Sequence, residues 1–123
     1  MSLSNANPSG PAQNYLIVMR EVVIAQDLAL TITDSDPGAQ VIIAATDAEA
    51  VAALGSVQSL VLAFIADRPA RFARSGLARA IAQRGGRVVL LGDEAEATGP
   101  TKAWDVLEQP FNTDAVLAKL ARR

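Results

Sequence analysis

The sequence predicts a three-layer α/β domain built on a parallel β-sheet, and two observations lead to this prediction. Short, wholly apolar runs alternate along the chain with longer amphipathic segments, a pattern typical of parallel strands joined by right-handed helical crossovers. Hydrophobic residues make up 50% of the 123 positions and charged residues 20%. A chain of this length and composition can bury one core, so we expect a single compact domain.

Five apolar runs are the expected strands. Runs without alternating polar residues fit strands that are buried on both faces of a parallel sheet. The runs are residues 15–19, 41–44, 60–65, 88–91 and the weaker 104–107. Five strands in a chain of this length favour a flavodoxin-like, doubly wound sheet with strand order 2-1-3-4-5. Ligands of such folds bind at the carboxyl ends of the strands, so chemistry is expected there.

The first two segments between the runs predict amphipathic helices. In residues 21–33 the apolar side chains recur at nearly helical spacing, namely Val23, Ile24, Leu28 and Ile32. Thr46 and Glu49 are three residues apart, which is the spacing of a capping box. A second helix should therefore begin at Thr46 and end near Gly55.

The second half of the chain predicts two more helices and one irregular connection. Residues 71–84 are basic and rich in alanine, which predicts one helix that ends at the glycine pair 85–86. Because Gly99 and Pro100 break helical continuity, residues 93–103 should form a short helix or a loop. Asn112 or Thr113 should cap a final helix.

The N-terminal residues 1–13 differ in composition from the rest of the chain. They are small and polar and are interrupted by two prolines, so we expect a disordered leader before a domain at 14–123. The leader has neither the basic nor the apolar region of a signal peptide, which favours a cytoplasmic protein. No apolar run of the chain is long enough to span a bilayer, so no membrane contact is expected.

The composition excludes several classes of chemistry. The chain has no histidine and no cysteine, which removes disulfides, zinc sites built on these residues and histidine-based catalysis. We therefore expect neither an enzyme nor a cofactor. The net charge is −2, without the basic excess of a nucleic-acid-binding domain. Six arginines surround the third helix and form either a patch for an acidic partner or a solvated face: Arg68, Arg71, Arg74, Arg79, Arg84 and Arg87.

Two motifs resemble those of response regulator receiver domains. Residues 16–21 (LIVMRE), followed by an apolar helix, resemble the opening strand of the family. Residues 106–111 (VLEQPF) resemble its closing strand and Lys-Pro-Phe-type motif. The resemblance covers the chain from Tyr15 to the C-terminus. It implies a two-component signalling module and a cis bond before Pro110. It also implies contact through the last strand, the last helix and the preceding element, with a homodimer as one candidate assembly.

The positions that carry the family's chemistry are altered in this chain. Phosphoryl transfer to a receiver needs carboxylates after the first strand to hold Mg²⁺ and an aspartate nucleophile at the end of the third. A hydroxyl after the fourth strand and a lysine after the fifth stabilise the phosphoryl oxygens. The resemblance places at these positions Met19, Arg20 with the neighbouring Glu21, Phe64, Gly92 and Gln109. It therefore implies a pseudo-receiver without catalytic residues or a metal, in which Phe64 is buried and fills the former phosphate pocket.

Several alternatives remain open at these positions. Arg20 could replace the metal and pair with Asp93 or Asp67, or it could be a solvated loop residue. Glu21, Asp67 and Asp93 could form a replacement metal site, or they could be ordinary carboxylates at helix starts. Trp104 could anchor an interface or cap the sheet edge. A different function, binding of a small anion or a nucleotide at Arg20, is the second hypothesis.

Overall fold

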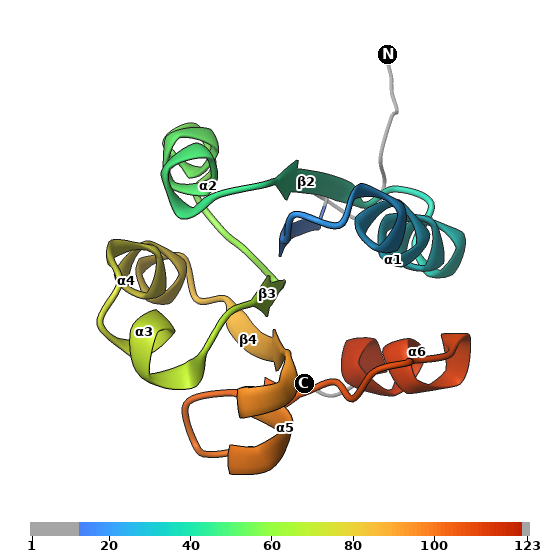
Figure 1. Ribbon diagram of the computed structural model, residues 1–123. Coiled ribbons are helices and arrows are strands. Elements are labelled where there is room, and N and C mark those ends of the chain that lie inside the picture. Colours follow the sequence, from blue (N-terminus) through green and yellow to red (C-terminus); the bar gives the residue numbers. More distant parts are fainter. Residues whose placement is uncertain (1–12, 122–123) are drawn as a thin grey trace.

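The predicted parallel sheet is present in the computed structural model, which describes residues 13–121 (Figure 1). Its five strands are all parallel and follow the order β2-β1-β3-β4-β5, so the predicted fold class and topology are confirmed. The strands are β1 (Asn14–Val18), β2 (Gln40–Ala44), β3 (Leu62–Ala66), β4 (Arg87–Leu91) and β5 (Asp105–Val106). Residues 1–12 of the predicted leader lie outside the described residues.

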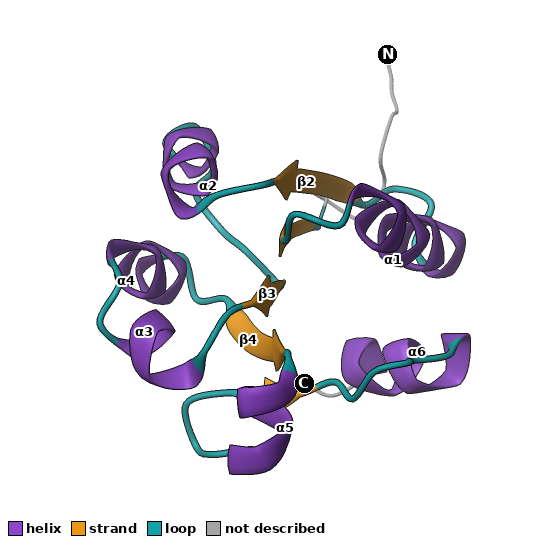
Figure 2. Ribbon diagram, in the orientation of Figure 1, coloured by secondary structure: helices purple, strands orange, loops and turns teal. Residues whose placement is uncertain are grey.

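Helices cover both faces of the sheet (Figure 2). The helices α1 (Val22–Ser35) and α6 (Thr113–Ala121) lie on one face. The other face carries α2 (Asp47–Leu54), α3 (Pro69–Ala73), α4 (Gly76–Gln83) and α5 (Asp93–Thr98). None of the helices in the described part of the chain is long and apolar enough to cross a membrane.

The wholly apolar strands are explained by burial on both sides. Successive side chains of a strand point to opposite faces of the sheet. Leu16 and Val18 of β1 therefore pack in the core beneath α2 and α4, whereas Tyr15 and Ile17 pack beneath α1 and α6. All four are buried, so the strand has no face on which a polar side chain would be tolerated.

The buried face of α1 differs from the predicted one. Ala25, Leu28 and Ile32 are its buried residues, whereas Val23 is 71% exposed. At 3.6 residues per turn, Val23 is rotated by about 140° from Leu28 around the helix axis. Once Leu28 faces the sheet, Val23 must face away from it, so its predicted place in the core is wrong.

The single helix predicted for residues 71–84 is instead a pair of helices. Ser75 separates α3 from α4: its hydroxyl donates to the carbonyl of Phe72 at 2.7 Å and accepts from the amide of Ala78 at 3.1 Å. Ser75 thus closes one helix and caps the next. The predicted end of α4 is confirmed, because Gly85 adopts a φ of 73° and the Gly86 amide bonds back to the Ile81 carbonyl at 3.1 Å.

Trp104 packs edge-to-face against Phe72, with 6.5 Å between the ring centroids. Phe72 belongs to the core beneath α2 and α4. The half-buried Trp104 covers that core from the end of the sheet at which β4 and β5 begin. This contact favours the interpretation that Trp104 caps the sheet edge.

Replacement of Thr46 by alanine should lower the free energy of unfolding by about 1 kcal/mol. The Thr46 hydroxyl accepts from the amide of Glu49 at 3.2 Å and caps α2, as predicted, while the Glu49 carboxylate accepts from the amide of Ala45 at 3.3 Å. Urea unfolding would measure the loss. Thr46→Ser keeps the hydroxyl and is the control; equal losses in both variants would show that the cap is not the cause.

Candidate functional site

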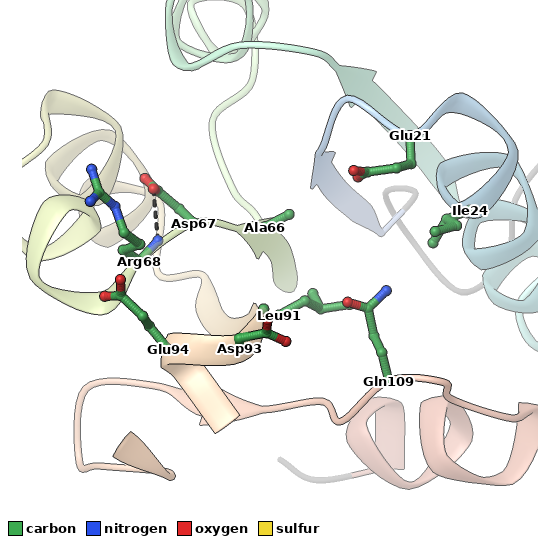
Figure 3. A pocket seen from close by; sticks show the side chains of 10 residues that line it. Glu21, Ile24, Ala66, Asp67, Arg68, Leu91, Asp93, Glu94 and Gln109 are labelled. Atoms are coloured by element: carbon green, nitrogen blue, oxygen red, sulfur yellow. Dashed lines mark hydrogen bonds between the residues drawn. The ribbon is translucent and has the colours of Figure 1, made fainter. Parts of the chain in front are cut away.

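The carboxyl ends of β1, β3 and β4 border a cavity of about 540 Å³ (Figure 3). This edge of the sheet is where ligands of doubly wound folds bind. Half of the residues that line it are charged: Glu21, Ile24, Ala66, Asp67, Arg68, Leu91, Gly92, Asp93, Glu94 and Gln109. A second cavity of about 440 Å³ adjoins it on the side of β2 and α2.

Most of the residues singled out from the sequence do meet at this edge. Glu21, Gly92 and Gln109 line the larger cavity, and Met19, Arg20 and Glu21 line the smaller one. The backbone amide of Gln109 donates to the Glu96 carboxylate at 3.0 Å, which fastens the loop after β5 to α5. The bond between Gln109 and Pro110 is cis, as predicted.

Phe64 is buried as predicted, but it does not fill the pocket. It pairs with Ile17 on one side and Val89 on the other, in the middle of β3, and its side chain lies in the core beneath α1 and α6. It lines neither cavity at the carboxyl edge. The strand continues for two residues beyond it, so the prediction that Phe64 occupies the strand end is wrong.

Ala66 occupies the strand end instead. Val18 pairs with Ile65, so the next residues of the two strands, Met19 and Ala66, stand at the same level, and both line the smaller cavity. On the other side Ala66 pairs with Leu91, which directly precedes Gly92. The side chain at the carboxyl end of β3 is therefore an exposed methyl group.

Asp67, the next residue, is held by its neighbours. Its Oδ1 accepts from the amide of Arg68 at 2.7 Å, and its Oδ2 accepts from Nη1 of Arg71 at 2.7 Å (the Arg68 bond is dashed in Figure 3). The same Nη1 lies 3.7 Å from Oδ2 of Asp47 at the start of α2. Both oxygens of Asp67 are thus engaged, and its side chain is only 10% exposed.

Of the two alternatives for Arg20, the structure favours the solvated loop residue over the ion pair. Arg20 is exposed, and neither Asp67 nor Asp93 is paired with it in the described part of the chain. Arg71 takes Asp67 instead, because residues four apart along a helical turn are direct neighbours. The interpretation of Arg20 as a lock on Asp67 or Asp93 is therefore wrong.

The acidic residues of the edge do not converge. Figure 3 shows Glu21 across the cavity from Asp67 and Glu94, with Asp93 on a third side. Within residues 13–121 no three acidic side chains come close enough together to hold a metal ion. The arrangement favours the interpretation of Glu21, Asp67 and Asp93 as separate carboxylates near helix starts.

Half of the six arginines around the third helix serve the fold itself. Arg84 donates through Nε to the carbonyls of Leu54 and Val57, at 3.1 and 2.8 Å. Arg87 donates to the carbonyl of Lys119 at 2.8 Å, and Arg71 pairs with Asp67. The other three are exposed and form a solvated basic face together with the half-exposed Arg71: Arg68, Arg74 and Arg79.

Comparison with known proteins identifies the fold. No protein-family model and no curated protein sequence matches this chain. Among solved structures, the chain is similar to a response regulator receiver protein from Sinorhizobium medicae, with a TM-score of 0.62 and 23% identity over 91% of this chain and 98% of that one. It is similar to the chemotaxis response regulator CheY4 of Vibrio cholerae, with a TM-score of 0.63 and 22% identity over 89% and 97%.

A third similar structure is a response regulator receiver modulated diguanylate cyclase from Pelobacter carbinolicus, with a TM-score of 0.63 and 21% identity over 88% of each chain. At these identities the likeness is one of fold. The chain therefore has the fold of response regulator receiver domains.

Proposed function

We propose that this chain is a signalling module with the receiver fold that acts through protein contact, without accepting a phosphoryl group. One observation carries the proposal: the carboxyl end of β3 presents the methyl group of Ala66 beside Met19 and Arg20. A methyl group cannot attack a phosphoryl donor, and a guanidinium at the end of β1 would repel the Mg²⁺ ion that the transfer needs.

The rest of the edge supports the same proposal. Gly92 after β4 offers no hydroxyl and Gln109 after β5 offers no ammonium group to stabilise phosphoryl oxygens. Asp67 is the nearest carboxylate to the end of β3, but Arg71 and the amide of Arg68 occupy both of its oxygens. The chain is accordingly proposed to be non-enzymatic and to need no cofactor.

The proposed partners are proteins of a signalling pathway. The similar structures are named as a response regulator receiver protein, a chemotaxis response regulator and a response regulator receiver modulated diguanylate cyclase. In a module that carries no phosphoryl group, information would pass through the surface alone. The surface is therefore where the specificity of this chain is proposed to lie.

Incubation with acetyl phosphate and Mg²⁺ should leave the intact mass of the protein unchanged. An intact receiver domain with its acidic residues in place is the positive control for the reagent. Asp67→Asn and Asp93→Asn variants would locate any label. A phosphoryl adduct on the wild-type chain that disappears in either variant would overturn the proposal.

The second hypothesis, anion binding, concerns the arginines of the smaller cavity. Arg20, Arg68 and Arg71 all line the 440 Å³ cavity at the carboxyl edge. The same cavity also carries Glu21, Asp47 and Asp67, so its charges are balanced and favour no anion over another ligand. A thermal-shift screen with inorganic phosphate and nucleotides separates the two functions. If a ligand stabilises the wild-type chain but not the Arg20→Ala variant, ligand binding would replace protein contact as the proposed function.

A further inference from the structure

The exposed large hydrophobic side chains of the described residues lie on β2, the strand at one edge of the sheet, and on the helices that precede and follow it. All of them belong to α1, β2 or α2, and they are 42% to 71% exposed: Val22, Val23, Leu30, Ile43 and Val51. None lies on α5, β5 or α6, the face that the family resemblance implies for contact. Figure 1 shows β2 as the outermost strand, between α2 and α1. We call the exposed Ile43 and the side of β2 that faces away from β1 the β2 edge surface.

Within residues 13–121 no strand pairs with the side of β2 that faces away from β1, and β2 lacks the usual protection of an edge strand. The strand reads QVIIA and contains neither a charge nor a proline. The Gln40 amide and the Ala44 carbonyl bond toward the β1 side, at 2.8 and 3.1 Å. Because alternate residues of a parallel strand bond to the same neighbour, Val41 and Ile43 direct their backbone amides and carbonyls away from β1. These groups can pair with another extended chain.

The sequence around this edge is acidic, although Arg71 of α3 lies 3.7 Å from Asp47 at one end of it. Residues 21–57 contain six acidic residues and not one lysine or arginine: Glu21, Asp27, Asp34, Asp36, Asp47 and Glu49. Asp36 precedes β2 and Asp47 follows it, so acids flank the strand at both ends. A segment that binds here must cover apolar side chains and should carry positive charge.

These charges argue against a second copy of the chain as the occupant. Pairing β2 with β2 of another copy would bring two acidic edges together and cost electrostatic energy. The arginine-bearing α3 and α4 of another copy offer charge but contribute no exposed large hydrophobic side chain. Neither arrangement covers the apolar residues with a complementary surface.

We propose that the β2 edge surface binds an extended segment of a partner protein in which apolar residues alternate with lysine or arginine. The segment adds a sixth strand beside β2, pairs with the backbone of Val41 and Ile43, and sets its cations near the flanking acids. The inference rests on the proposed contact function and specifies the surface and the chemistry of the partner.

Binding of a short fluorescent peptide of alternating lysine and valine, measured by anisotropy, tests the inference. The wild-type chain should bind this peptide more tightly than an alternating glutamate–valine peptide or a lysine–serine peptide. Salt should weaken the binding because part of it is electrostatic. If the lysine–serine peptide binds as tightly as the lysine–valine peptide, the binding depends on charge and not on apolar contact, and the proposal is overturned.

Two variants of Ile43 locate the site. Ile43→Pro removes the outward amide without changing charge and should weaken peptide binding about tenfold, which corresponds to ~1.4 kcal/mol. Ile43→Ser keeps the amide but loses the apolar contact, and it decides the question if the proline variant does not fold. Ala82→Ser on the exposed side of α4 is the matched control and should bind as the wild type does.

The remaining outcomes are also decisive. If the peptide binds both Ile43 variants as tightly as the wild type, the proposal is overturned. It is also overturned if the wild-type chain forms a dimer that Ile43→Pro dissociates, because the occupant of the surface would then be a second copy. Failure of the peptide to bind overturns this inference alone. The proposed contact function fails separately, through a phosphoryl adduct in the mass measurement.

Discussion

Replacing Phe64 by alanine is expected to lower the free energy of unfolding by about 3–5 kcal/mol. The Phe64 side chain is 0% exposed and lies between two neighbouring strands, where it pairs with Ile17 and Val89. Removing the ring deletes buried apolar surface and leaves a cavity that close-packed neighbours cannot fully close. Because small domains are stable by only about 5–15 kcal/mol, this loss would remove much of the stability of the fold.

Urea unfolding monitored by circular dichroism would measure the effect of Phe64→Ala. Phe111→Ala removes the same group from a half-buried position at the rim of the same core, and it should cost clearly less. A loss below about 1.5 kcal/mol for Phe64→Ala would place the ring outside the tightly packed core, because a value that small is typical of a substitution that conserves volume.

The fold was predictable because its signal is local. The strands β1, β3 and β4 are buried on both faces, so each contains an uninterrupted apolar run in the sequence, and Leu16 to Val18 illustrate the pattern. The capping pair Thr46 and Glu49 and the glycine at 85 likewise act within one helical turn. Features that depend on neighbours in sequence can be predicted from sequence.

The errors concern features that distant contacts decide. Residues 71–84 favour one helix by composition, but Phe72 and Leu77 must both reach the core beneath α2 and α4, and Ser75 supplies the cap that allows the break. Val23 fits an amphipathic pattern as well as its neighbours do, and the orientation of α1 on the sheet leaves it exposed. Composition alone cannot choose between these arrangements.

The residue at the end of β3 was mispredicted for a related reason. Residues 60–66 are apolar throughout, so the run itself does not mark which residue ends β3. The pairing of Ala66 with Leu91 settles this, and pairing is a long-range property. Asp67, the first polar residue after the run, was the one local signal that the strand extends beyond Phe64. The ion pair between Arg71 and Asp67 was also not predictable from sequence, because it forms only if α3 begins shortly after Asp67.

Restoring two carboxylates at the positions that the structure identifies should create a magnesium site. We expect Arg20→Asp with Ala66→Asp to bind Mg²⁺, which takes hard oxygen ligands and is usually held through one or two carboxylates and water. Both positions are exposed and line the same 440 Å³ cavity as Glu21. The substitution also removes the cation that stands at the end of β1. New charge here is hydrated, so the fold should tolerate it.

Chemical unfolding with and without Mg²⁺ measures this gain. At a Mg²⁺ concentration about ten times the dissociation constant, the double variant should be stabilised by ~1.4 kcal/mol, and the wild-type chain should be unaffected. Arg20→Asn with Ala66→Asn has the same shape without the charge and should not respond. Phe64→Asp should unfold the chain, because an unpaired carboxylate in this core has no compensating partner. If Phe64→Asp instead folded and bound Mg²⁺, the strand end would lie at Phe64, and the assignment of Ala66 to the site would be wrong.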